Sequence, residues 1–131
     1  MKTHSSSTDS IRVLIIDDEE TIQSVVKMGL SLSVDWDISS ASSGQEGIAL
    51  AKSEHPSVIL LDVMMPDMDG LATFKVLQQD PDTQEIPVIF LTAKAQTADR
   101  QQFQATGVSG VITKPFNSLH LADQIISILN W

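Results

Sequence analysis

Short apolar runs alternate along the chain with segments of helical periodicity. Five runs rich in β-branched and other apolar residues lie at 11–16, 34–38, 58–61, 88–91 and 108–112. The first, third and fourth runs are almost continuously apolar, which is typical of strands covered on both faces. The second run alternates apolar and polar residues, so we expect it at an edge of the sheet. Strands that alternate regularly with helices predict βαβ units and a parallel sheet.

The segments between and after these runs carry helix signals. The apolar residues of the first segment repeat at helical spacing, and a capping box precedes the second. The third is expected to end by Pro81, and Gly107 is a stop signal for the fourth. The first helix is expected to open with Glu19 and Glu20, the second with the capping box of Ser43 and Glu46, and the third after Gly70. Thr97 is expected to cap the fourth helix, and Ser118 the last, which reaches Trp131.

Length and pattern together predict one folded domain. A chain of 131 residues can bury roughly two-thirds of the surface that it exposes when unfolded. Residues 1–10 are rich in Ser and Thr and lack apolar periodicity, so we expect a flexible tail followed by a domain over 11–131. Five strands and five helices in alternation predict an α/β, doubly wound, five-stranded parallel sheet. Such sheets bind ligands beyond the carboxyl ends of their strands.

The predicted strands end in residues that form a coherent chemical set. Asp17 and Asp18 follow the first strand, Asp62 the third, Thr92 the fourth, and Lys114 the fifth. The carboxyl ends of parallel strands share one edge, so these side chains are expected to converge. Clustered carboxylates raise one another's pKa unless a cation is present. An oxygen-only set of ligands favours Mg²⁺ or Mn²⁺, and Mg²⁺ usually keeps water and phosphate among its ligands.

A metal ion beside phosphate indicates phosphoryl transfer, in which the protein mainly positions groups and neutralises charge. Asp62 is the candidate nucleophile, because carboxylates can form an aspartyl-phosphate. Thr92 can donate a hydrogen bond to a phosphoryl oxygen. Lys114 can bring a positive charge to the same group.

Four blocks of the sequence, in order, resemble the receiver domain of two-component response regulators, in its stand-alone, chemotaxis-regulator-like form. They read VLIIDDEE, VILLDVMMPDMDG, VIFLTAKA and GVITKPF, and the resemblance extends over 11–131. It implies a flavodoxin-like fold with strand order 2-1-3-4-5 and the function of a response regulator. The phosphoryl group would pass to Asp62 from a histidine kinase or a histidine phosphotransfer protein, in a Mg²⁺-dependent reaction.

The same resemblance implies roles for the other residues at the strand ends. Asp17 and Asp18 would be the acidic pair. Asp18, Asp62 and the backbone carbonyl of Met64 would bind Mg²⁺ directly, with Asp17 acting mainly through water. Thr92 would be the switch hydroxyl, and Lys114 the phosphate-binding lysine, joined to Pro115 by a cis peptide bond.

One position departs from the family pattern. Many members carry Tyr or Phe three residues before the lysine, where this chain has Val111. Val111 therefore provides no ring for an aromatic rotamer switch. We expect phosphorylation to remodel the face formed by the fourth helix, the fifth strand and the fifth helix by some other route.

Composition narrows the functional classes. Seventeen acidic and eight basic residues give a net charge of −9, which argues against direct nucleic-acid binding. The absence of cysteine excludes disulfides and thiol nucleophiles and favours a reducing cytoplasm. No apolar run is long enough to span a bilayer, so no membrane association is expected. The signal is expected to pass to an unidentified output protein or to a region outside this sequence, and dimerisation of the phosphorylated form is left open.

Three other functions share features with parts of this sequence. A haloacid-dehalogenase-like phosphatase would use the sequence DMDG, but Asp67 does not directly follow a strand, and Asp67 and Asp69 are typical turn residues. A nucleotide-binding module would need a phosphate-binding loop with its lysine and hydroxyl pair, which the sequence lacks. A pseudo-receiver would serve only as a protein-interaction surface, and the intact set around Asp62 argues against it. We therefore expect a signalling switch rather than a turnover enzyme.

Overall fold

A single parallel sheet forms the centre of the fold. The computed structural model describes residues 11–66, 68–93 and 97–131. The strands lie in the order β2-β1-β3-β4-β5, which confirms the predicted flavodoxin-like sheet and the edge position of the second strand. The chain adds β2 on one side of β1 and then crosses over to add β3, β4 and β5 on the other side. The topological switch point therefore lies between β1 and β3. The bounds are β1 (Arg12–Ile16), β2 (Asp37–Ala41), β3 (Val58–Asp62), β4 (Val88–Thr92) and β5 (Gly110–Thr113).

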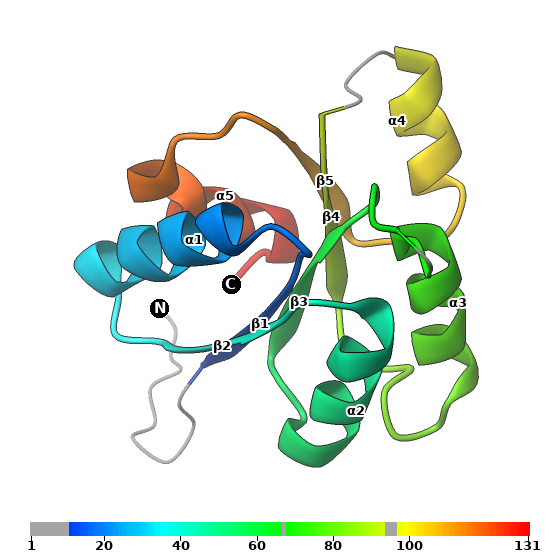
Figure 1. The fold of residues 1–131 in the computed structure, drawn as a ribbon. Coiled ribbons are helices and arrows are strands. Elements are labelled where there is room, and N and C mark those ends of the chain that lie inside the picture. Colours follow the sequence, from blue (N-terminus) through cyan, green and yellow to red (C-terminus); the bar gives the residue numbers. More distant parts are fainter. Residues whose placement is uncertain (1–10, 67, 94–96) are drawn as a thin grey trace.

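Helices cover both faces of this sheet. α1 and α5 lie on one face, and α2, α3 and α4 lie on the other (Figure 1). Within the described part of the chain, no helix combines the length and apolar character needed to cross a membrane. The bounds are α1 (Glu20–Ser33), α2 (Gly44–Glu54), α3 (Gly70–Gln79), α4 (Thr97–Gln104), a 3₁₀ helix η1 (Ser118–His120) and α5 (Leu121–Leu129).

The sheet separates two apolar cores. On the face of α2, α3 and α4, the rings of Phe74, Phe90 and Phe103 meet edge to face, with centroid distances of 5.4 and 5.6 Å. On the other face, Leu30 of α1 and Ile125 of α5 are fully buried against the sheet. Burial of each such side chain contributes about 1.5–3 kcal/mol to folding. The continuously apolar strands are therefore explained by burial on both faces.

Two helix starts follow the predicted capping chemistry. The Ser43 hydroxyl accepts a hydrogen bond from the Glu46 amide at 3.1 Å, and the Glu46 carboxylate accepts one from the Ser42 amide at 2.7 Å. Asp69 caps α3 by accepting from the Ala72 amide at 2.8 Å, so its carboxylate has the structural role expected from the sequence. The prediction for Asp67 lies outside the described residues.

Several predicted boundaries differ from those in the structure. β2 begins at Asp37, not at residue 34, because Val34 is the extended C-cap of α1 and pairing with β1 starts where Arg12 meets Asp37. β5 starts at Gly110 rather than residue 108. Ser118 is not the last helix cap: Asn117 accepts from the Leu119 amide at 3.0 Å, and the first turn is 3₁₀ before α5 begins.

The fourth helix also differs at its start. α4 begins at Thr97 itself, so Thr97 is its first residue rather than the residue that caps it. The position before it lies outside the described residues.

The segment after β5 is anchored against α1. A Cβ added at Gly29 of α1 would lie 2.7 Å from the Ser118 Cβ, so only glycine allows this approach. The Ser33 hydroxyl also donates to the Leu119 carbonyl at 3.2 Å. Helix α1 and η1 are therefore in close contact beside the segment that carries Lys114.

Candidate functional site

The carboxyl ends of the central strands bring the predicted residues together. In the sheet register, Ile16 of β1 pairs with Leu61 of β3, and Asp62 pairs with Leu91 of β4. Thr92 pairs with Thr113, the residue before Lys114. The predicted convergence at one edge of the sheet is confirmed.

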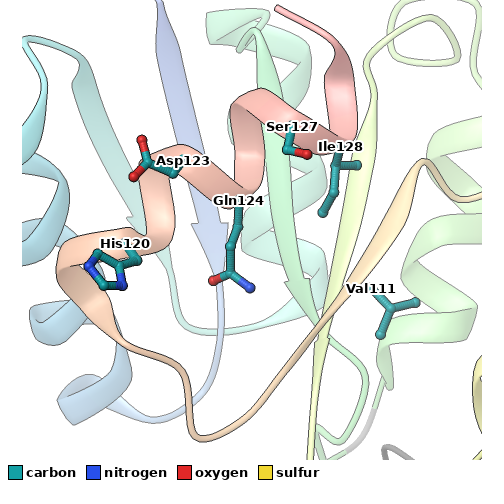
Figure 2. A pocket seen from close by; sticks show the side chains of 6 residues that line it. All are labelled: Val111, His120, Asp123, Gln124, Ser127 and Ile128. Atoms are coloured by element: carbon teal, nitrogen blue, oxygen red, sulfur yellow. The ribbon is translucent and has the colours of Figure 1, made fainter.

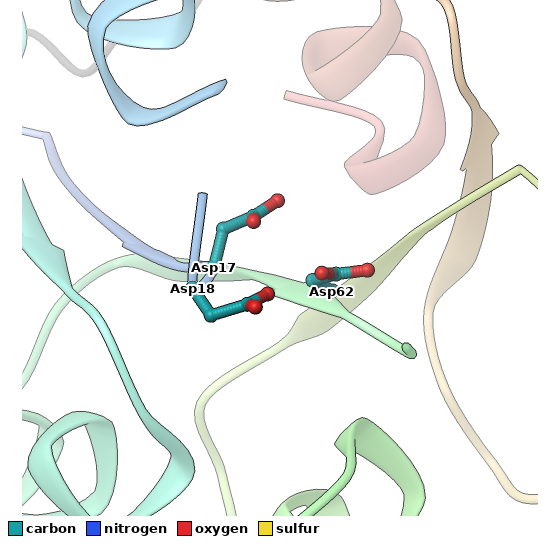
Figure 3. Close-up of side chains that lie close together, drawn as sticks. All are labelled: Asp17, Asp18 and Asp62. Atoms are coloured by element: carbon teal, nitrogen blue, oxygen red, sulfur yellow. The ribbon is translucent and has the colours of Figure 1, made fainter. Parts of the chain in front are cut away.

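Three carboxylates form a compact cluster at this edge. Oxygen atoms of Asp17, Asp18 and Asp62 all lie within 4.8 Å of one another (Figure 3). Asp17 is fully buried and Asp62 is 2% exposed, whereas Asp18 is exposed. Two buried carboxylates so close to a third require compensation by positive charge or by proton uptake.

Asp17 is held by protein groups through both of its oxygens. Its Oδ1 accepts from the Glu19 amide at 2.9 Å, and its Oδ2 lies 3.0 Å from Lys114 Nζ. Asp62 Oδ1 accepts from the Met64 amide at 3.1 Å. Asp18 and Asp62 therefore present more of their oxygens to an incoming ligand than Asp17 does.

Lys114 supplies a cation shared by these acids. Its Nζ lies 3.4 Å from Asp62 Oδ1 and 3.6 Å from Glu19 Oε1, in addition to its contact with Asp17. Burial disfavours the charged ammonium, but the hydrogen bond and charge of Asp17, followed by those of Asp62, outweigh it and raise the pKa of Lys114. The lysine is therefore charged at neutral pH, and it offsets one of the three carboxylates.

Asp62 has an unusual affinity for protons. Burial, and then the nearby charge of Asp17, raise the pKa of Asp62 to about 6 from its ordinary value of 3.8. The Lys114 charge and the Met64 amide oppose this rise. Further positive charge beside such a carboxylate stabilises its ionised form.

The chemistry of the donors fits a divalent cation. The cluster offers carboxylate oxygens without His or Cys, and one lysine offsets only part of its charge. Oxygen donors with excess negative charge suit Mg²⁺ or Mn²⁺. Asp18, Asp62 and the Met64 carbonyl remain the predicted direct ligands.

Thr92, Lys114 and Met64 surround the cluster. Thr92 is buried at the end of β4, and its carbonyl accepts from the Lys114 amide at 2.8 Å, which ties these two predicted residues together. The Lys114–Pro115 bond is cis, as the family resemblance implied. The Met64 side chain is 57% exposed. Lys94, in the sequence block VIFLTAKA, lies outside the described residues.

One structurally important residue was missed by sequence reasoning. Gln23 of α1 is buried, and its amide donates to the Asp17 carbonyl at 2.7 Å and to the Ser42 hydroxyl at 3.1 Å. It thereby fixes the end of β1, which carries the acidic pair, against the end of β2. The sequence feature that could have revealed this role is a polar residue on the same helical face as the buried Val26 and Leu30.

Val111 lies where the family often has an aromatic ring. It is half-buried on β5 and lines a pocket of about 510 Å³ together with residues of η1 and α5 (Figure 2). Gln124 and Ile128 are among the α5 residues in this lining. Its side chain packs against the core on the face of α2, α3 and α4, at the margin of this pocket.

Comparison with known proteins agrees with this geometry. The sequence model of the response regulator receiver domain matches residues 13–126. The probable transcriptional regulator ycf27 of Porphyridium aerugineum is 36% identical over 118 residues, which cover 90% of this chain and 48% of that protein. The response regulator PleD of Caulobacter vibrioides is 36% identical over 119 residues, which cover 91% of this chain and 26% of that protein. The chain thus spans about half or less of the length of these relatives.

Solved structures share the whole fold. The chemotaxis protein CheY4 of Vibrio cholerae has a TM-score of 0.84 and 28% identity, over 92% of this chain and 99% of that chain. A response regulator from Desulfuromonas acetoxidans has a TM-score of 0.81 and 28% identity, over 92% of this chain and 97% of that chain. Because the family model spans most of the chain and the neighbours share its complete topology, the chain belongs to the response regulator receiver domain family of two-component signalling.

Proposed function

We propose that the chain is a phosphorylation switch that accepts a phosphoryl group on Asp62 from the phosphohistidine of a histidine kinase or histidine phosphotransfer protein. The observation that carries the proposal is the position of Asp62. Its buried carboxylate lies among two other acids and 3.4 Å from the Lys114 ammonium. A purely structural acid would have no need of this costly environment.

The transfer has a simple balance of bonds. An oxygen of the Asp62 carboxylate attacks phosphorus, the phosphorus–nitrogen bond of the donor breaks, and the donor imidazole leaves with that electron pair. Lys114 neutralises charge on the phosphoryl oxygens, and its link to Asp17 holds it at the edge of the sheet. The Thr92 hydroxyl, at the end of the neighbouring strand, donates a hydrogen bond to a phosphoryl oxygen. Water later attacks phosphorus, the bond between phosphorus and the Asp62 oxygen breaks, and inorganic phosphate leaves the restored carboxylate.

The predicted cofactor is Mg²⁺, held by Asp18, Asp62 and the Met64 carbonyl, with Asp17 acting through water. When bound, Mg²⁺ supplies positive charge that offsets the three carboxylates and the phosphoryl oxygens. The acids of this chain provide the negative site that such an ion needs.

The proposed output is a changed protein surface rather than a released product, and the chain acts as a switch that catalyses its own phosphorylation and dephosphorylation. Phosphate adds about −1.5 to −2 charges at the site, which draws in Thr92 and Lys114 and biases the face of α4, β5 and α5. The recipient is an output protein or region that is not identified. Relatives named as transcriptional regulators are longer than this chain, and with a net charge of −9 we propose no direct nucleic-acid contact for this domain. The expected cytoplasmic location stays a prediction.

Incubation with acetyl phosphate and Mg²⁺, followed by intact mass measurement, tests the proposal. We expect one phosphoryl group per chain, released by hydroxylamine as expected for an acyl phosphate. Asp62→Asn should abolish the adduct. The matched control Asp69→Asn keeps a good helix cap and removes an acid from the same loop, so it should retain the adduct. Full phosphorylation of Asp62→Asn would refute the assignment.

A further inference from the structure

A second hollow lies on the α3 and α4 side of the sheet, next to the proposed phosphorylation site, and the Met64 side chain lines it. It has a volume of about 510 Å³, which is within the range of sites that bind ligands or peptide side chains. We call it the α3–α4 groove. Its principal lining residues are Met64, Met65, Asp69, Leu71, Asp99 and Phe103.

The floor and walls of this groove are apolar and adaptable. Met65 and Phe103 are almost completely buried beneath it, whereas the Met64 side chain is 57% exposed. Exposed methionines are typical of surfaces that bind partners, because the flexible thioether fits varied shapes.

The rim of the groove carries negative charge. Asp69 at the start of α3 and Asp99 in α4 both line it, and no lysine or arginine among the described residues does so. Among the residues that the structure describes, neither carboxylate forms an ion pair. The nearest arginine in the sequence, Arg100, instead donates to Thr113 on β5 at 3.1 Å. Apolar walls under two acids complement a partner that presents an apolar side chain next to a positive one.

We propose that the α3–α4 groove binds a peptide segment of a partner protein in which a leucine-like side chain adjoins lysine or arginine. The apolar side chain fills the space between Met64, Leu71 and Phe103. The positive group lies at the rim, where Asp69 and Asp99 approach it from the two helices. The proposal concerns the unphosphorylated chain and does not depend on the reaction at Asp62.

Methionine methyl NMR on the full chain tests the proposal, because this chain carries reporters inside and outside the groove. Met64 and Met65 line the groove, and Met28 is 66% exposed on α1, on the other face of the sheet. The probe is the peptide acetyl-Gly-Leu-Arg-Leu-Arg-Gly-amide. Two control peptides replace its arginines with glutamate or its leucines with serine. We expect saturable shifts of Met64 and Met65 with the probe, and no saturable shift with either control.

Paired variants test the charge contribution. Asp69→Asn with Asp99→Asn should weaken binding of the probe roughly fivefold, as loss of two rim charges predicts. Asp35→Asn with Asp37→Asn changes the net charge equally on the distant β2 edge and should leave binding unchanged. Equal weakening by both pairs, equal shifts at Met28, or no saturable shift at Met64 and Met65 would each overturn the proposal.

Discussion

The ammonium nitrogen of Lys114 lies 3.0 Å from an oxygen of Asp17, although 97 positions separate the two residues in the sequence. The contact places a cation over a fully buried carboxylate and within 3.4 Å of Asp62. Within 11–66, 68–93 and 97–131, charge balance in the Asp17, Asp18 and Asp62 cluster therefore rests on one lysine set against three acids. This imbalance predicts how pH, Mg²⁺ and substitutions at the site change the stability of the chain and the pKa of Asp62.

Asp62 should make stability depend on pH in the absence of metal. Its folded-state pKa of about 6 exceeds the ordinary 3.8, so the folded chain binds this proton more tightly than the unfolded chain does. The resulting stability is full below pH 3.8 and is lost as the pH rises through about 6, by up to about 3 kcal/mol. Asp62→Asn should remove this dependence and be more stable than the wild type at pH 7.5.

Urea unfolding in a chelator, followed between pH 4 and pH 7.5, measures this effect. The exposed Asp37→Asn on β2 is the control and should keep the wild-type pH profile. A wild-type profile in Asp62→Asn would show that another group causes the dependence.

Lys114→Met should raise the pKa of Asp62 further. The lysine charge lowers this pKa in the wild type, and its loss leaves the Asp17 and Asp62 carboxylates to repel each other. Carboxyl ¹³C NMR titration reads the pKa directly. Lys52→Met, which breaks the surface ion pair of Lys52 with Asp80, should leave the Asp62 titration unchanged. An unchanged Asp62 pKa in Lys114→Met would contradict the described geometry.

Mg²⁺ should stabilise the folded chain at neutral pH. At ten times its dissociation constant, an ion that binds only the folded state adds about 1.4 kcal/mol to the free energy of unfolding. Asp18 is exposed, so Asp18→Asn should fold normally while losing most of this gain. Thermal unfolding with MgCl₂ and with NaCl of equal ionic strength provides the measurement. An equal gain in wild type and Asp18→Asn would place the ion elsewhere.

Gly70→Ala should damage the site through the backbone. A Cβ at this position would overlap the Asp62 carbonyl and lie 2.6 Å from the Val63 Cα, and neither backbone atom can move independently of β3. We expect a loss of about 1–3 kcal/mol in stability and slower phosphorylation by acetyl phosphate. Gly107→Ala is the control. Its φ of 96° predicts a loss of about 1–2 kcal/mol, but it should leave the phosphorylation rate of the folded chain unchanged.

Phosphorylation should change amide hydrogen exchange in α4, β5 and α5. Thr92 pairs with Thr113 in the sheet, and Arg100 of α4 donates to Thr113, so a movement of Thr92 toward phosphate acts on this link without an aromatic ring at Val111. Exchange measured with and without beryllofluoride, a phosphoryl mimic, tests the expectation. Asp62→Ala should show no difference, and equal exchange in the wild type would refute the proposed remodelling.

Much of the fold could be predicted from the sequence, because the central strands are apolar on both faces and their ends carry distinctive polar residues. Asp62 was found because a charge that ends a buried strand has few structural explanations. The convergence of Asp17, Thr92 and Lys114 followed from parallel pairing alone. The cap at Asp69 followed from local turn chemistry.

The remaining features depend on tertiary contacts that no local pattern encodes. The apolar alternation of residues 34–38 resembles a strand, but pairing begins only where Asp37 meets Arg12. Gln23 resembles an ordinary polar residue of a helix until its amide is seen between the ends of β1 and β2. The α3–α4 groove depends on the separation of two helices, which periodicity does not specify.

The close approach of Gly29 and Ser118 has a mechanical consequence for Lys114. The segment between β5 and η1 is fixed at one end by the hydrogen bond from the Lys114 amide to the Thr92 carbonyl, and at the other by its contact with α1. A short span clamped at both ends can bend very little. The reach of Lys114 toward a phosphoryl group must therefore come from rotation about its own side-chain bonds, with the backbone serving as a fixed pivot.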